Sequence, residues 1–157
     1  MNMRKIKWIV VHCSATRKGA DIKGKSIAAG HLLPVSKGGR GWKAPGYHYI
    51  VELDGNIYAA LPEEKISNGV KGHNAEAVNV CYIGGVNAAS TPEDTRTPAQ
   101  KESLRRLLSE LRERYPHARI AGHRDLSPDL DGDGRITPRE WTKACPSFDA
   151  AAEYRGI

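Results

Sequence analysis

The continuous apolar run Trp8–Val11 places the strongest constraint on what this chain can fold into. It lies between Lys7 and the small polar residues Ser14 and Thr16, a pattern typical of a buried strand. A strand of this kind needs other elements to cover it. The run leads directly into His12, so a titratable side chain is expected at the end of a core strand.

The remaining elements predict a mixed sheet. A hairpin of two strands is expected over 47–53 and 56–60, where β-rich segments flank an Asp-Gly turn. Two short apolar runs predict further strands over 78–83 and 119–122. The clearest helix covers Pro98–Tyr115, with Thr97 as N-cap and Gln100 at the capping-box position. Its apolar stripe consists of Leu104, Leu107, Leu108, Leu111 and Tyr115. A short helix is expected over 26–33 and another helix start at Thr137. Strands that alternate with helices, together with one hairpin, favour a single α/β domain over residues 1–157, with a mixed central sheet flanked by helices.

Composition limits the class of protein further. The 157 residues suit one domain, and 24 Lys and Arg against 18 Asp and Glu give a net charge of +6. The charge favours an anionic partner: nucleic acid, an anionic membrane or an acidic cell-wall polymer. No apolar run approaches the roughly 20 residues that a membrane span needs, and no signal peptide is recognised. We therefore expect a chain made in the cytoplasm.

Three residues have the chemistry of a catalytic zinc site: His12, His123 and Cys145. Three protein ligands leave a fourth position open for water. Taken one at a time, a histidine is more often structural and a cysteine more often a small core residue, so residue type alone leaves both interpretations open. Because strand side chains alternate, only one of His12 and Cys13 can face a metal. Cys13 and Cys81 lie in apolar runs and are expected in the core.

Four motifs in order resemble the zinc-dependent N-acetylmuramoyl-L-alanine amidases of the phage lysozyme type. They are IVVHCSAT (9–16), GYHYIV (46–51), GHRD (122–125) and KACPSFD (143–149). The resemblance runs from about Ile6 to Asp149. That family shares its fold with peptidoglycan recognition proteins.

The resemblance implies a set of site residues and a reaction. His12, His123 and Cys145 match the zinc ligands, Tyr47 the tyrosine beside the zinc-bound water, and Lys143 the lysine that assists hydrolysis. His73 and Asn74 lie where the family builds a wall of its substrate groove. The implied reaction is hydrolysis of the amide between N-acetylmuramic acid and the first L-alanine of the peptidoglycan stem peptide.

The segment Ser127–Trp141 is an insert relative to the shorter phage enzymes, and its pattern resembles an EF-hand calcium loop. Counted on the ~12-residue loop, acidic residues fall at positions 1, 3, 5 and 12 and a glycine at 6: Asp129, Asp131, Asp133, Glu140 and Gly134. The carbonyl of Arg135 takes position 7 and Thr137 takes position 9. The alternative is that the Asp-Gly pairs form turns and that Glu140 completes a capping box with Thr137. Both can hold together, and calcium would then stiffen the segment ahead of Lys143 and Cys145.

Two other classes of function compete with the amidase. A peptidoglycan-binding module without activity typically lacks the cysteine ligand, whereas Cys145 is present. A nucleic-acid-binding domain is suggested by charge alone, and the chain has no zinc-finger spacing or RNA-binding signature. We therefore interpret the charge as attraction to an acidic cell wall. We expect a monomer that reaches peptidoglycan after release, as in phage lysis, or after delivery into a rival cell.

Overall fold

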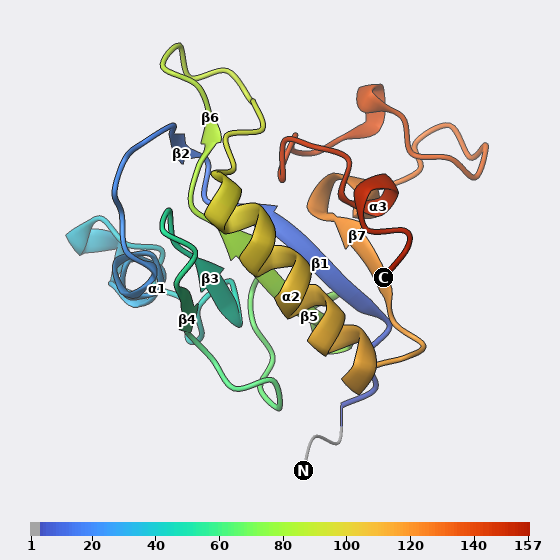
Figure 1. The fold of residues 1–157 in the computed structure, drawn as a ribbon, viewed down its shortest axis with the longest axis horizontal. Helices are drawn as coiled ribbons and strands as arrows, with labels where there is room; N and C mark the ends of the chain where they lie inside the picture. Colours follow the sequence, from blue (N-terminus) through green and yellow to red (C-terminus); the bar gives the residue numbers. More distant parts are fainter. Residues whose placement is uncertain (1–3) are drawn as a thin grey trace.

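The computed structural model describes residues 4–157 and contains a five-stranded sheet with the order β4-β3-β5-β1-β7. Strand β1 (Trp8–Cys13) lies between β5 (Ala77–Tyr82) and β7 (Arg119–Gly122), parallel to both. Strand β3 (Tyr49–Val51) is parallel to β5, and β4 (Ile57–Ala59) closes the edge as the antiparallel arm of the hairpin. Figure 1 shows these strands fanned behind helix α2 (Pro98–Arg114). The expected mixed α/β fold is confirmed.

Helix α2 covers one face of the sheet. Its N-terminus forms the expected capping box, because the Gln100 N–H donates to Thr97 Oγ1 at 3.0 Å and the Thr97 N–H donates to Gln100 Oε1 at 2.9 Å. The buried leucine stripe of the helix packs against Ile9, Val11, Val78 and Val80 of the central strands. Their burial stabilises the domain through the hydrophobic effect.

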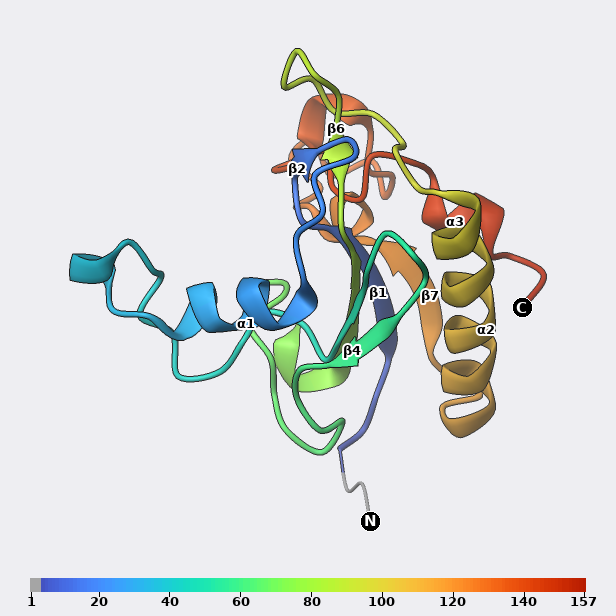
Figure 2. The ribbon, with the colours of Figure 1, turned by 60° about the vertical axis from the view of Figure 1, so that its left-hand side comes forward.

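Helix α1 (Gly24–Leu32) lies on the other side of the sheet, as Figure 2 shows. It packs near Ile50 and Cys81, whose side chains alternate with those that face α2. Gly24 permits this close approach, because a Cβ there would lie 2.8 Å from the Cβ of Tyr58. The helix leads into a single turn, η1 (Val35–Lys37), which extends away from the sheet.

Several short elements go beyond or differ from the sequence prediction. A two-stranded ribbon joins β2 (Thr16–Arg17) to β6 (Gly85–Val86), and α3 (Ala150–Glu153) follows the last motif; η2 (Asn74–Glu76) and η3 (His123–Leu126) are single turns. The helix start at Thr137 yields only one turn, η4 (Pro138–Glu140), because the backbone becomes extended at Trp141. No helix in the described part of the chain is long and apolar enough to cross a bilayer.

The segment after Cys145 is held by a buried arginine. The Arg96 guanidinium is 1% exposed, pairs with Asp94 at 2.8 Å and with Glu153 at 2.6 Å, and stacks on the Phe148 ring at 3.4 Å. Its hydrogen bond to Glu153 holds the pKa of that carboxyl below its usual value. These contacts fix the C-terminal segment against the start of α2.

Candidate metal centre and groove

The parallel pairing of β1 and β7 brings two histidines together. Val11 lies opposite Gly122 in the register, so His12 and His123 are the next residues at the same end of neighbouring strands. Their ring centroids are 4.9 Å apart. Cys145 approaches from the C-terminal segment, with its Sγ 3.8 Å from His12 Nδ1. One ligand atom from each of the three residues lies within 4.8 Å of the others, so the group can hold a metal ion.

Backbone contacts position the cysteine. The Cys13 N–H donates to Cys145 Sγ at 3.2 Å, and the Arg124 N–H donates to the Cys145 carbonyl at 2.9 Å. The Cys13 side chain belongs to the main core, on the other face of β1. The hydrogen-bonding contact with Cys13, together with burial, raises the pKa of the Cys145 thiol well above its usual value.

Both imidazoles are held in the form that binds metals. Burial, followed by the neighbouring His123, lowers the pKa of His12 to about 3. Burial and the charge of Lys143 lower the pKa of His123 to about 4. Both rings are therefore neutral at pH 7 and keep a free lone pair.

A buried asparagine that the sequence analysis missed selects the ligand atom of His12. Asn79, on β5, accepts a hydrogen bond at 2.7 Å from His12 Nε2 through its Oδ1, and its Nδ2 donates to Ser67 Oγ at 2.8 Å. With the proton on Nε2, His12 presents the lone pair of Nδ1 toward Cys145. The chain makes room for Asn79 at Gly69, where a Cβ would lie 2.3 Å from the Asn79 Cγ.

We expect Asn79→Ala to lower zinc affinity about 10- to 100-fold, the usual cost of losing an outer partner of a metal-binding histidine. Competitive titration with a chromogenic chelator measures this affinity directly. Ser67→Ala is the matched control, because it removes only the hydrogen bond on the far side of Asn79. Equal zinc affinity for Asn79→Ala and wild type would show that Asn79 has no part in orienting His12.

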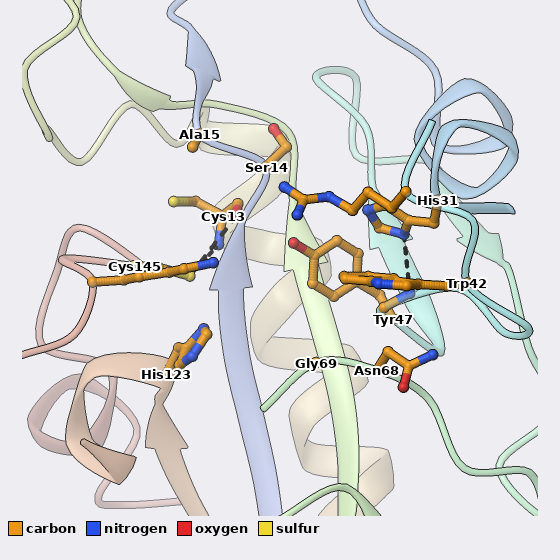
Figure 3. A pocket seen from close by; sticks show the side chains of 13 residues that line it. Cys13, Ser14, Ala15, His31, Trp42, Tyr47, Asn68, Gly69, His123 and Cys145 are labelled. Atoms are coloured by element: carbon orange, nitrogen blue, oxygen red, sulfur yellow. Dashed lines mark hydrogen bonds between the residues drawn. The ribbon is translucent and has the colours of Figure 1, made fainter. Parts of the chain in front are cut away.

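Tyr47 and Lys143 line the same cavity as His123 and Cys145. The Tyr47 ring lies 5.1 Å from the His12 ring, and Lys143 is exposed two residues before Cys145. Figure 3 shows Tyr47 across the end of β1 from Cys145 and His123. Burial raises the pKa of Tyr47 well above its usual value, so the phenol stays protonated and can donate a hydrogen bond.

The cavity opens into a groove of about 680 Å³. The two spaces share Arg40, Trp42, Asn68, Gly69, His123 and Lys143. His73 lines the groove, whereas the Asn74 side chain accepts a hydrogen bond from the Val70 N–H at 2.7 Å. The groove lining includes three permanent cations and no carboxylate: Arg40, Lys71 and Lys143 are the cations. An acidic polymer would meet attraction along this surface.

The insert forms a compact loop beside the groove. Asp129, Asp131, Asp133 and Glu140 each offer a carboxylate oxygen within 4.8 Å of the others. Backbone N–H groups of the loop already donate to these carboxylates, including Gly134 to Asp129 at 2.8 Å and Leu130 to Glu140 at 2.6 Å. Arg135 donates its N–H to Asp133, and Thr137 forms the capping box with Glu140. Ser127 and Pro128, at the start of the insert, line the groove.

A neutral two-histidine, one-cysteine donor set that opens into a cationic groove defines the class of site: a candidate metal-dependent hydrolase centre. Comparison with known proteins then places the chain. A family model described as N-acetylmuramoyl-L-alanine amidase matches residues 2–147, and the chain belongs to this family. The chain is therefore a peptidoglycan amidase, an enzyme of cell-wall lysis.

Relatives and solved structures agree with this assignment. The endolysin of Klebsiella phage KP32 is 38% identical over 141 residues, which cover 90% of this chain and 80% of that protein. The Ph2119 endolysin of the Thermus scotoductus MAT2119 bacteriophage Ph2119 has a TM-score of 0.68 at 25% identity, covering 98% of this chain and 86% of that one. Drosophila PGRP-LB shares the fold, with a TM-score of 0.68 at 17% identity, covering 99% of this chain and 82% of that one.

Proposed function

We propose that this amidase holds a zinc ion through His12 Nδ1, His123 and Cys145 and hydrolyses the bond between N-acetylmuramic acid and L-alanine. The observation that supports zinc most directly is the donor set itself, with two neutral imidazoles and one thiol around a single point. Zinc bound there supplies a water of lowered pKa and polarises the scissile carbonyl. With three protein ligands, the metal would keep one coordination position for water or substrate.

Tyr47 and Lys143 are proposed to act on the reacting atoms. The protonated Tyr47 phenol would orient the attacking water by a hydrogen bond. The Lys143 ammonium, at the border of the cavity and the groove, would stabilise the oxyanion of the tetrahedral intermediate. Its charge already reaches the centre, because it lowers the pKa of His123.

The groove is proposed to bind the peptidoglycan strand, with His73 in its wall. Support comes from the cationic lining and from the shared mouth of the groove and the metal cavity. We propose that the enzyme acts as a monomer and meets the wall after its release or delivery from the cell that makes it. Asn74 is proposed to act indirectly, through the turn that carries His73.

The activity is tested with purified peptidoglycan. We expect wild type to release stem peptides with new L-alanine amino ends, a zinc chelator to stop the release, and added zinc to restore it. Metal analysis on the same samples should give one zinc per chain. Release that continues after complete removal of zinc, or products that lack a free L-alanine amino group, would contradict the proposal.

Calcium binding by the insert stays a prediction. We expect Ca²⁺ titration by calorimetry to show one site that is lost in Asp129→Ala and weakened in Glu140→Gln. Glu140→Gln is the milder variant, because it keeps the length of the side chain and one acceptor oxygen, whereas the charge and one of the two acceptors for the Leu130 and Thr137 N–H groups are lost. A titration of wild type without heat, and without any change in thermal stability, would refute calcium binding.

A further inference from the structure

The net charge of the protein is concentrated in one continuous segment, residues 16–46, called here the basic arm. It contains a single acidic residue, Asp21, and seven basic ones: Arg17, Lys18, Lys23, Lys25, Lys37, Arg40 and Lys43. Subtracting these from the 18 acidic and 24 basic residues of the chain leaves 17 of each. The rest of the molecule is thus neutral overall, and the whole charge of +6 belongs to the arm.

The charges of the basic arm face solvent. All seven basic side chains are exposed, and the described contacts neutralise only Lys23, which pairs with Asp21 at 3.1 Å. Figure 2 shows η1, at the outer end of the arm, standing away from the sheet, whereas the inner end of α1 contacts the body, where the Gly24 N–H donates to the Glu52 carboxylate at 2.6 Å. A surface of this kind attracts an anionic partner over about a Debye length.

The outer end of the basic arm is apolar. Leu32, Leu33 and Val35 are 45%, 43% and 74% exposed, and Pro34 between them is exposed too. Two other large apolar side chains in the described chain are comparably exposed, Ile66 and Leu130, and they lie far from this stretch in sequence. Three exposed aliphatic side chains within four positions form a tip that water solvates poorly.

The tip has a defined shape. The Gly41 N–H donates to the Leu33 carbonyl at 2.7 Å, and the Trp42 N–H donates to the His31 carbonyl at 2.9 Å. The chain can fold back this closely because Gly39 lies against Leu33, where a Cβ would be 2.1 Å from the Leu33 carbonyl oxygen. The backbone is therefore internally bonded while the aliphatic side chains point outward.

We propose that the basic arm is a docking surface for a bilayer rich in anionic lipid headgroups, with Leu32, Leu33 and Val35 entering the acyl boundary and the seven cations lying among the headgroups. Apolar side chains within a basic surface are the pattern of interfacial membrane segments. Nucleic acid and wall polymer would satisfy the cations but offer no hydrocarbon phase to the tip. Arg40 and Trp42 of the same arm line the groove, so docking would hold the groove beside the bilayer.

Vesicle flotation with the full chain tests this inference. We expect binding to phosphatidylcholine vesicles that contain phosphatidylglycerol to be at least about tenfold tighter than to pure phosphatidylcholine, and to weaken as salt rises. The double variant Leu33→Ser, Val35→Ser should lose about tenfold or more of this binding. Lys25→Glu combined with Lys37→Glu should lose a similar amount.

Leu130→Ser is the matched control, because Leu130 is 73% exposed against 74% for Val35 and lies outside the arm. It should bind vesicles like wild type. Equal binding to both kinds of vesicle, or full binding by the tip variant, would overturn the proposal. Full vesicle binding by the tip variant, combined with tight binding to duplex DNA that the charge variant loses, would instead identify a general polyanion surface. Thermal melting and hydrolysis of a soluble muropeptide should match wild type in every variant, so this test is independent of the proposed catalytic chemistry.

Discussion

Cys145→Ala is expected to lower the rate of stem-peptide release by about a thousandfold or more, because it removes one of three ligands and the only anionic one. The two histidines that stay are neutral, so the remaining site carries no charge to balance a dication. Metal analysis and release of L-alanine amino ends should therefore fall together.

Cys13→Ala is the control for this variant. It removes the neighbouring thiol, which packs in the core, but keeps the backbone N–H that donates to Cys145. We expect a modest loss of stability with zinc content and turnover within a few-fold of wild type. If Cys145→Ala keeps bound zinc and activity, the ligand set proposed here is wrong.

Lys143→Met should lower kcat about 100- to 1000-fold, the usual cost of losing one stabilising group at a developing oxyanion. Zinc content and KM should change little, because Lys143 is exposed and its proposed contact with the oxyanion forms chiefly in the transition state. Lys143→Arg should recover part of the rate, since it restores the charge with a different geometry.

Lys71→Met provides the comparison within the same groove. Lys71 lines the groove but not the metal cavity, so its loss should raise KM with a small effect on kcat. Equal losses of kcat in the two variants would mean that Lys143 acts through general attraction of the substrate. In that case its proposed contact with the oxyanion would have to be abandoned.

The elements that the sequence predicts well are those whose local signals agree with their packing. Helix α2 carries its own cap, first-turn proline and apolar stripe, and the structure reproduces all three. The apolar runs likewise form β1 and β5, because a strand that is buried on both faces needs apolar residues at consecutive positions. The proximity of His12 and His123 follows once two parallel strands are neighbours.

Long-range polar contacts were beyond the sequence analysis. Asn79 stands in an apolar run, and such a residue can pair with many partners; its contact with His12 depends on the neighbouring strand and on the space left at Gly69. The signal in the sequence that could have identified Asn79 was its place as a polar residue inside a buried strand. The end of η4 was also missed, because an extended Trp141 overrides a good helix start.

The net charge of the chain likewise does not predict where the charged residues lie in the structure. The count of +6 pointed to an acidic wall, but a count does not say where the charge lies. The structure separates a neutral body from the basic arm and its aliphatic tip. The net charge therefore belongs to the arm, whereas two of the three cations of the groove, Lys71 and Lys143, belong to the neutral body.

The order in which the site is assembled follows from strand β1. This strand precedes both of its neighbours along the sequence, which come from residues 77–82 and 119–122. The contact between His12 and Cys145 spans 133 positions. Contacts this distant in sequence form late in folding. No nascent chain that stops short of Cys145 holds all three candidate donors, so a ribosome that has not yet reached this residue carries a wall-degrading enzyme without its candidate metal centre.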